Sequence, residues 1–241
     1  MRFTSLGIVD DMIEGGTEDY GQLGRFCYVS CWTEEQVESI PQWNMYSSDM
    51  SGVRISISFN SLSDLLILRP YSFDDDKYIN IPINMFPEKL SPMGMQPPYV
   101  PEYFKVTYTE EQSLLKPKVY NYRKTDTGYE ENVQIDLLGK FKSLKWQFQN
   151  ESRFKFFLTP WSLDEMKNVK TTEEHLSLFK RLKDTQPMLN YLDLDLNPDV
   201  LSNIEITMGP KISEEKKEIL KLIVDKYCPN VVINESNLEI R

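Results

Sequence analysis

The segment that most constrains the fold is residues 25–33, Arg-Phe-Cys-Tyr-Val-Ser-Cys-Trp-Thr. Its side chains are almost all apolar or small, which is typical of a strand at the centre of a sheet. A second strand is expected over 52–59, where apolar residues alternate from Val53 to Phe59. A third is expected from Phe154 to Leu158. Because strands outnumber helices, the sequence predicts an α+β protein with mainly antiparallel, twisted sheets and a few peripheral helices.

The length of 241 residues is within the range of a single domain, which we expect over 1–241. Residues 70–103 differ in texture, because they combine a run of aspartates with several prolines. Strands are expected on both sides of this segment and need partners. The segment is therefore predicted to be a loop-rich surface excursion of one domain, and not a linker between two.

A helix is predicted from about Glu214 to Tyr227. Ser213 is a suitable N-cap, and acidic residues follow it in the first turn. Ile219, Leu222 and Ile223 recur with Tyr227 at helical spacing, so we expect this face to be buried.

The formal net charge of −10 disfavours nonspecific binding to nucleic acids, because an acidic surface repels phosphates. No apolar run approaches the roughly 20 residues needed to cross a bilayer, so no membrane partner is expected. The first residues also lack the basic-then-apolar order of a secretory signal. A cytoplasmic location is expected.

No metal centre is expected from the three cysteines and one histidine. Cys27 and Cys31 fall on one face of the first strand, about 13 Å apart at strand rise, which is too far for a disulfide. We expect both to act as small buried residues. His175 lies in a polar helix, away from other candidate ligands.

Three segments together resemble a widespread bacterial family of unknown function. They are Val29-Ser-Cys-Trp32 followed by a W-x-x-Y turn and a G-V-x-I strand; Lys142–Arg153, matching K-x-x-x-W-x-x-E-x-E-x-R with Gln149 in place of the first glutamate; and Ile204–Pro210 with a serine-to-arginine ending at 236–241. The family's opening strand and helix have no counterpart before Met1, so the chain is expected to begin at the family's second element, either as a natural short form or with the opening missing.

This layout is similar to the split sheet of ADP-ribosyltransferase-like folds. The resemblance implies NAD as cofactor, Glu151 as the catalytic carboxylate, and a toxin or phage-defence effector as the biological role. A carboxylate at the edge of a cleft can orient a ribose hydroxyl and stabilise positive charge at the anomeric carbon. The cofactor-binding residues implied are Ser30, Trp43, Tyr46 and Arg54.

Each of these residues also has a structural interpretation. Glu151 either serves catalysis or pairs with Arg153 or Lys142. Ser30 is either functional or a small core residue. The two aromatic residues at 43 and 46 either stack on a planar ligand or close the edge of the core, and Arg54 either reaches an anion or pairs at the surface. The alternative function is therefore a non-catalytic domain that recognises an unknown macromolecular target, a partner protein or a small ligand.

Overall fold

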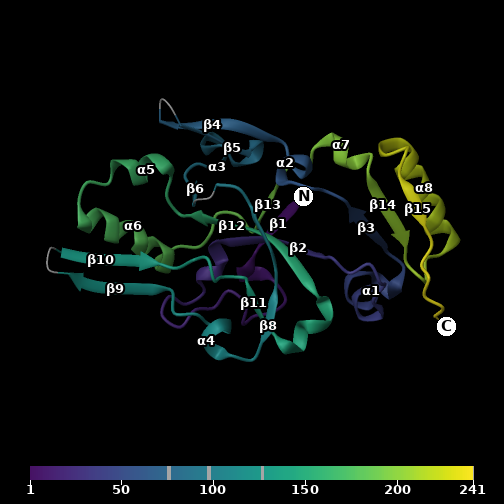
Figure 1. Cartoon of the computed structure of the whole chain (residues 1–241), viewed down its shortest axis with the longest axis horizontal. Helices are drawn as coiled ribbons and strands as arrows, with labels where there is room; N and C mark the ends of the chain where they lie inside the picture. The colour runs from purple at the N-terminus through teal and green to yellow at the C-terminus, as the bar shows by residue number, and fades with distance from the viewer. Residues whose placement is uncertain (75–76, 97–98, 126–127, 241) are drawn as a thin grey trace. The chain divides into compact units, whose positions relative to one another are not determined.

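The computed structural model describes residues 1–241 except 75–76, 97–98, 126–127 and 241 (Figure 1). The chain forms two compact units, each made of two separate segments. Unit 1 comprises Met1–Thr33 and Leu68–Leu194, and unit 2 comprises Glu34–Ile67 and Asp195–Arg241. The fold class is α+β with mostly antiparallel strand pairs, which confirms the sequence prediction. The single domain expected over 1–241 stays a prediction, and no one cut in the chain separates the units.

Unit 1 is built on a sheet in which β12 is the central strand. The order is β13-β1-β2-β12, and β12 also pairs with β7 and β6 on its other side. The six strands are β1 (Arg2–Ser5), β2 (Cys27–Thr33), β6 (Gly94–Met95), β7 (Glu102–Lys105), β12 (Glu151–Thr159) and β13 (Tyr191–Asp193). All nine residues of β12 are buried. The central strand predicted over 25–33 is thus a neighbour of the most buried strand, and begins two residues later than expected.

Segment 70–103 contributes to this architecture more than a surface excursion would. It holds the antiparallel hairpin of β4 (Leu68–Asp74) and β5 (Lys77–Pro82), as well as β6 and the start of β7. Its apolar residues Ile81, Met85 and Leu90 are buried. The loop-rich interpretation was therefore wrong for much of the segment, because strands and a helix accommodate several of its prolines: Pro82 ends β5 and Pro87 begins α3 (Pro87–Leu90). Residues 75–76 and 97–98 of the segment lie outside the described part.

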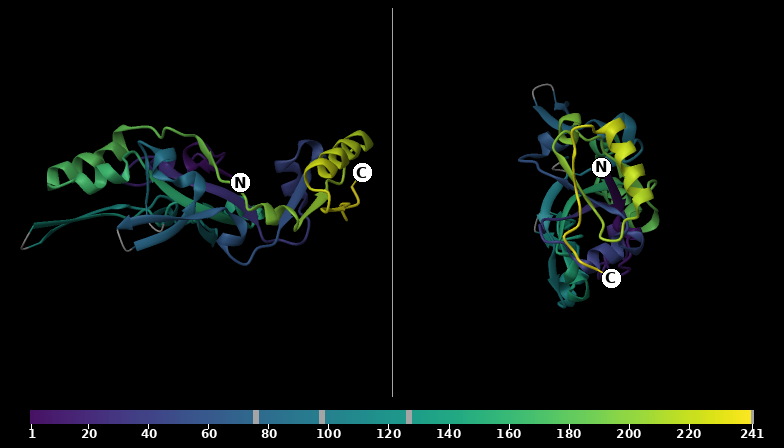
Figure 2. Two further views of the ribbon diagram at one scale, coloured as in Figure 1. Left: turned by 90° about the horizontal axis from the view of Figure 1, so that it is seen from above. Right: turned by 90° about the vertical axis from the view of Figure 1, so that its right-hand side faces the viewer.

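The other elements of unit 1 surround the central sheet. The antiparallel hairpin of β9 (Tyr120–Thr125) and β10 (Gly128–Val133) extends beyond the sheet, at the end where α6 (Thr172–Asp184) lies (Figure 2). A further strand, β8 (Thr107–Thr109), is parallel to β11 (Phe141–Ser143). The helices are α3 (Pro87–Leu90), α4 (Gln112–Leu115), α5 (Leu163–Asn168) and α6 (Thr172–Asp184). The 3-10 turns are η1 (Leu6–Ile8), η2 (Leu23–Phe26), η4 (Ile83–Met85) and η5 (Leu144–Gln149).

Unit 2 is a three-stranded sheet accompanied by α8. The order is β15-β14-β3, with β14 parallel to β15 and antiparallel to β3. The strands are β3 (Val53–Ile57), β14 (Ile204–Met208) and β15 (Val232–Asn234). The helical segments are α1 (Ile40–Tyr46), η3 (Ser48–Met50), α2 (Leu62–Leu65), α7 (Pro198–Leu201) and α8 (Glu214–Tyr227). Ile204, Ile206 and Met208 are buried while Glu205 between them is exposed, so one side of β14 faces the interior of the unit.

Among the described residues, no helix combines the length and the apolar character that crossing a bilayer would require.

Candidate functional site

Glu151 is the first residue of β12 and is only 4% exposed. A buried carboxylate needs compensating charges and hydrogen bonds, because leaving water is costly. Arg153 provides them from the same strand: its Nε donates to Oε1 of Glu151 at 2.6 Å and its Nη2 donates to Oε2 at 3.0 Å. Lys142 from β11 donates its Nζ to Oε2 at 3.2 Å. Both oxygens of the proposed catalytic residue are therefore occupied.

Glu14 completes a buried cluster of two acids and two bases, the ion quartet of Glu14, Lys142, Glu151 and Arg153. Nη1 of Arg153 donates to Oε1 of Glu14 and, at 2.9 Å, to the carbonyl oxygen of Gly139. Nζ of Lys142 lies 3.6 Å from Oε2 of Glu14, an oxygen that accepts no hydrogen bond within the described residues. The formal charges cancel, so the quartet is electrostatically complete without a ligand.

The pKa of Glu151 reflects this environment. Burial by itself raises the pKa of the carboxyl, but the charges and hydrogen bonds of Arg153, with the charge of Lys142, lower it below the usual value. Burial lowers the pKa of Arg153, yet the Glu14 carboxylate more than offsets this and holds it well above its usual value. Glu151 is thus an ionised, fully paired anion. Presenting it to a ribose hydroxyl would first require breaking ion pairs in a dry environment.

Ser30 lies in β2 on the other face of the same sheet. Residues directly opposite in an antiparallel pair share a face, and faces alternate along a strand. Ser30 is opposite Phe154, whereas Glu151 is opposite Thr33, so Ser30 and Glu151 point to opposite faces. Ser30 is buried, and its Oγ accepts a hydrogen bond from Nε1 of Trp32 at 3.0 Å. The sheet therefore does not bring these two predicted site residues together. Phe154, the residue opposite Ser30, is an odd number of positions from Glu151 along β12.

Trp43, Tyr46 and Arg54 belong to unit 2. Trp43 in α1 is 6% exposed and donates Nε1 to Oε2 of Glu38 at 2.9 Å, whereas Tyr46 is 65% exposed. Within the part of the chain that the structure describes, the hydrogen bonds of Arg54 in β3 are long: from Nη1 to the carbonyl of Gln36 at 3.4 Å and from Nη2 to Oγ1 of Thr207 at 3.5 Å. Trp43 is thus buried within unit 2, and of these two aromatic residues Tyr46 is the exposed one.

Glu38 links Trp43 to the end of the chain. Its carboxylate accepts hydrogen bonds at 2.7 Å from Oγ of Ser236 and at 2.7 Å from the amide of Asn237. Partial burial raises the pKa of Glu38, but these bonds, with those from Trp43 and the charge of Arg54, lower it overall. The serine of the expected ending thus anchors the terminal segment within unit 2.

Sequence reasoning missed one member of the ion quartet, Glu14, whereas it offered both Lys142 and Arg153 as ion-pair partners of Glu151. Trp146 next to this quartet is partly buried, and Nζ of Lys142 lies 5.0 Å from its ring centre. The pairing of Glu14 with Arg153 joins residues 139 positions apart, so no local sequence pattern predicts it.

The cysteine predictions are confirmed in part. All three cysteines are free, and Cys27 is buried, but Cys31 is exposed at the end of β2. The expectation that both would be buried was wrong for Cys31, because its part of β2 lies toward the edge of the core. No group of three or more potential metal ligands of the His, Cys, Asp or Glu type occurs among the residues that the structure describes.

The largest departure from expectation is the outer face of α8. Ser213 caps the helix as predicted, its Oγ accepting from the amide of Lys216. The apolar residues expected to be buried are instead exposed: Ile219 by 56%, Leu222 by 70%, Ile223 by 52% and Tyr227 by 65%. Only Val224 of this helix is buried. The periodicity correctly predicted an apolar face, but not that much of it is uncovered.

Comparison with known proteins finds no matching family model, no matching curated protein and no matching solved structure. The resemblances to the bacterial family of unknown function and to ADP-ribosyltransferase-like folds therefore stay predictions.

Proposed function

We propose that this chain is a non-catalytic interaction domain that binds a second copy of itself through α8. The observation that carries the proposal is the exposed apolar stripe, defined as Ile219, Leu222, Ile223 and Tyr227. Contiguous apolar surface of this kind on a helix marks an interaction site more often than a free surface. Burying one such side chain contributes about 1.5–3 kcal/mol, so burial of the stripes of two copies favours association against its entropic cost.

The charged residues at the two ends of the stripe favour a second copy of this chain as the binding partner. Glu215, Ile219, Leu222 and Lys226 are spaced by four, three and four residues, the spacing of a coiled-coil seam along one line of a helix. If two copies of α8 pair antiparallel about a two-fold axis, Ile219 meets Leu222 of the second copy. Glu215 then meets Lys226 of the second copy, at both ends of the interface. A parallel pair would instead place like charges together. The seam is self-complementary only in the antiparallel arrangement.

A transferase role with NAD is the weaker candidate. It requires a carboxylate that is free to reach a ribose hydroxyl, whereas both oxygens of Glu151 accept hydrogen bonds from cations. It also requires the serine strand to share a face with that carboxylate. A calorimetric titration with NAD separates the two roles, because a transferase of this type binds NAD at about micromolar to millimolar concentrations. We expect no saturable heat.

The three free cysteines are consistent with the cytoplasmic location expected from the sequence, since reducing compartments keep thiols unpaired. A target other than a second copy stays a prediction.

Sedimentation velocity over a range of protein concentrations tests the proposal. Wild-type protein is expected to dimerise reversibly, and Leu222→Glu is expected to be monomeric, because it places a charge in the seam. Val37→Glu is the matched control: Val37 is 78% exposed in the same unit but lies outside α8. It should dimerise like wild type. A wild-type protein that stays monomeric at about 1 mM, or equal weakening by both variants, would refute the proposal.

A further inference from the structure

A cavity of about 180 Å³ lies within unit 1, between the end of β12 and α6. It is lined by Gln96, Val133, Ile135, Phe157, Thr159, Trp161, Phe179 and Leu182. Phe157, Trp161 and Leu182 belong to the main apolar core, and the other apolar wall residues pack against that core. Protein interiors are close-packed, and gaps much larger than a water molecule are few. This space is larger than a water molecule and borders the core, so it is large enough to hold a small ligand.

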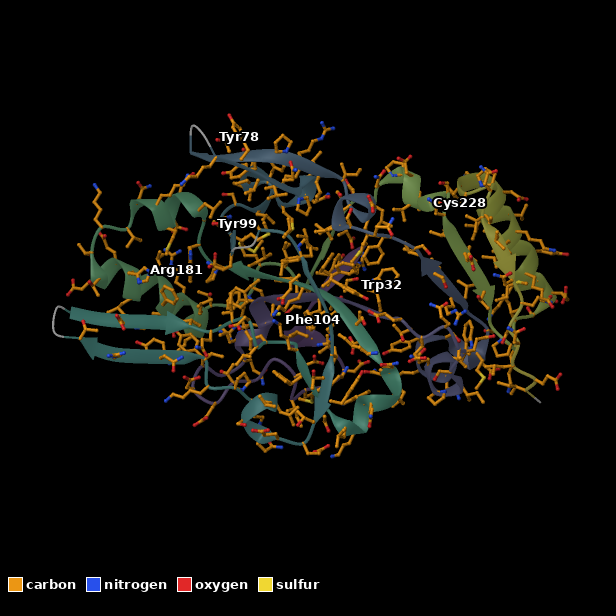
Figure 3. The ribbon with its side chains drawn as sticks, in the orientation of Figure 1. Trp32, Tyr78, Tyr99, Phe104, Arg181 and Cys228 are labelled. Atoms are coloured by element: carbon orange, nitrogen blue, oxygen red, sulfur yellow. The ribbon has the colours of Figure 1, made fainter. Side chains whose placement is uncertain are left out.

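The walls suit a flat ring. Trp161 and Phe179 are in tilted contact with ring centroids 5.5 Å apart, and Phe157 contributes a third aromatic side chain. The edge of the wall is braced by Arg181 of α6, which is labelled in Figure 3. Its Nη1 donates to the carbonyl of Pro160 at 3.2 Å and to Oε1 of Glu165 at 3.0 Å. These bonds hold α6 against the turn that carries Trp161, so the two aromatic walls keep their separation.

Two polar residues line the cavity, Gln96 and Thr159, and the side chain of one of them makes no hydrogen bond within the described residues. Oγ1 of Thr159 donates within the protein, with the carbonyls of Gly94 at 3.1 Å and Trp161 at 2.9 Å in range, so it can only accept from a ligand. The backbone N–H of Gln96 donates to the carbonyl of Phe157 at 3.0 Å, and this bond fixes the backbone of Gln96. Within the described residues, the carboxamide of Gln96 makes no hydrogen bond. It is therefore available as both donor and acceptor.

We propose that this cavity binds a single-ring aromatic molecule with one neutral hydrogen-bonding substituent, of the phenol class. The volume sets the size, since an apolar cavity of about 150 Å³ accepts benzene and this one is of similar size. A nucleotide does not fit. The apolar walls disfavour a charged ring substituent. Gln96 supplies the hydrogen bond to the phenol hydroxyl. This site is independent of the α8 stripe.

Titrations with phenol and toluene test the site, because the two rings have nearly the same size and differ in the hydroxyl group. Binding is followed by the chemical shift of the Trp161 indole proton and by calorimetry. Gln96→Leu is expected to weaken phenol about tenfold through loss of one hydrogen bond, and to leave toluene within about twofold. Equal effects on both ligands, or no saturable phenol binding to wild type, would overturn the proposal.

A filled cavity provides the second test. Val133→Phe places a ring in the space and should abolish binding of both ligands. Ile135→Phe fills the cavity from the neighbouring wall. It replaces Val133→Phe in the test if that variant has a lowered melting temperature. Phenol binding that persists in a folded filled variant would place the ligand elsewhere and contradict the inference.

Discussion

Replacing Glu151 with glutamine tests the role of the ion quartet. In wild type, Glu151 accepts hydrogen bonds from Nε and Nη2 of Arg153 and from Nζ of Lys142. Glutamine keeps the shape but has one acceptor oxygen, and its amide group would face donors. The quartet then contains one acid and two bases, all at least 90% buried. An uncompensated positive charge remains in the core.

The expected cost follows from this imbalance. Breaking a buried ion pair by removing one partner destabilises a protein by about 3–5 kcal/mol. For a protein of this size, that corresponds to a fall in melting temperature of roughly 6–20 °C. If Glu151 served only a catalytic role at a cleft edge, the same isosteric substitution would leave the melting temperature nearly unchanged.

Urea unfolding monitored by tryptophan fluorescence measures the difference. Glu102→Gln is the matched control, because Glu102 also pairs with two lysines, Lys140 at 2.8 Å and Lys155 at 3.3 Å, but its side chain is 38% exposed. Its loss should cost about 1 kcal/mol or less. A Glu151→Gln variant within 1 kcal/mol of wild type, or no less stable than the Glu102 variant, would refute the structural role.

Two further predictions concern the pH dependence of the Glu151 contribution and the burial of Trp43. The folded-state pKa of Glu151 is lowered, so its contribution to stability is present above the unfolded pKa of about 4.3 and is lost as pH falls through the folded value; the stability gap between wild type and Glu151→Gln should therefore narrow in urea titrations between about pH 5 and 3, and a constant gap would contradict this. Trp43→Ala should cost about 3–5 kcal/mol, because the indole is buried and bonded to Glu38, whereas Tyr46→Ala on the same helix should cost about 0.5 kcal/mol or less. Equal urea midpoints for these two variants would contradict the buried position of Trp43.

Local sequence patterns predicted elements better than they predicted their surroundings. The β2 and β12 strands follow from runs of apolar residues, and α8 follows from Ser213 and the helical spacing after it. Each of these patterns lies within a short stretch of sequence, where the periodicity of apolar residues reports the local helix or strand geometry. The same periodicity wrongly placed the Ile219 and Leu222 side chains in the core. Periodicity shows which residues share a face, but not what covers that face.

The candidate site depended on long-range information. That Ser30 and Glu151 point to opposite faces follows only from the register of β2 against β12, two strands that no short turn connects and whose register the turn geometry therefore does not fix. The pairing of Glu151 with Arg153 was one of the two interpretations open from the sequence, because residues two apart in a strand share a face. Glu14 could not be found in this way, since its contact with Arg153 depends on the fold as a whole.

The most direct test of the central claim is to mix two charge-reversed variants, Glu215→Lys and Lys226→Glu. Each variant alone brings like charges together at both ends of an antiparallel α8 pair, so its self-association should be at least about tenfold weaker than that of wild type. In the mixed dimer both contacts are again between opposite charges. We expect sedimentation of the mixture to show a heterodimer about as stable as the wild-type dimer, at concentrations where each variant alone is monomeric. A mixture that remains monomeric under conditions where wild type dimerises would contradict the antiparallel α8 interface.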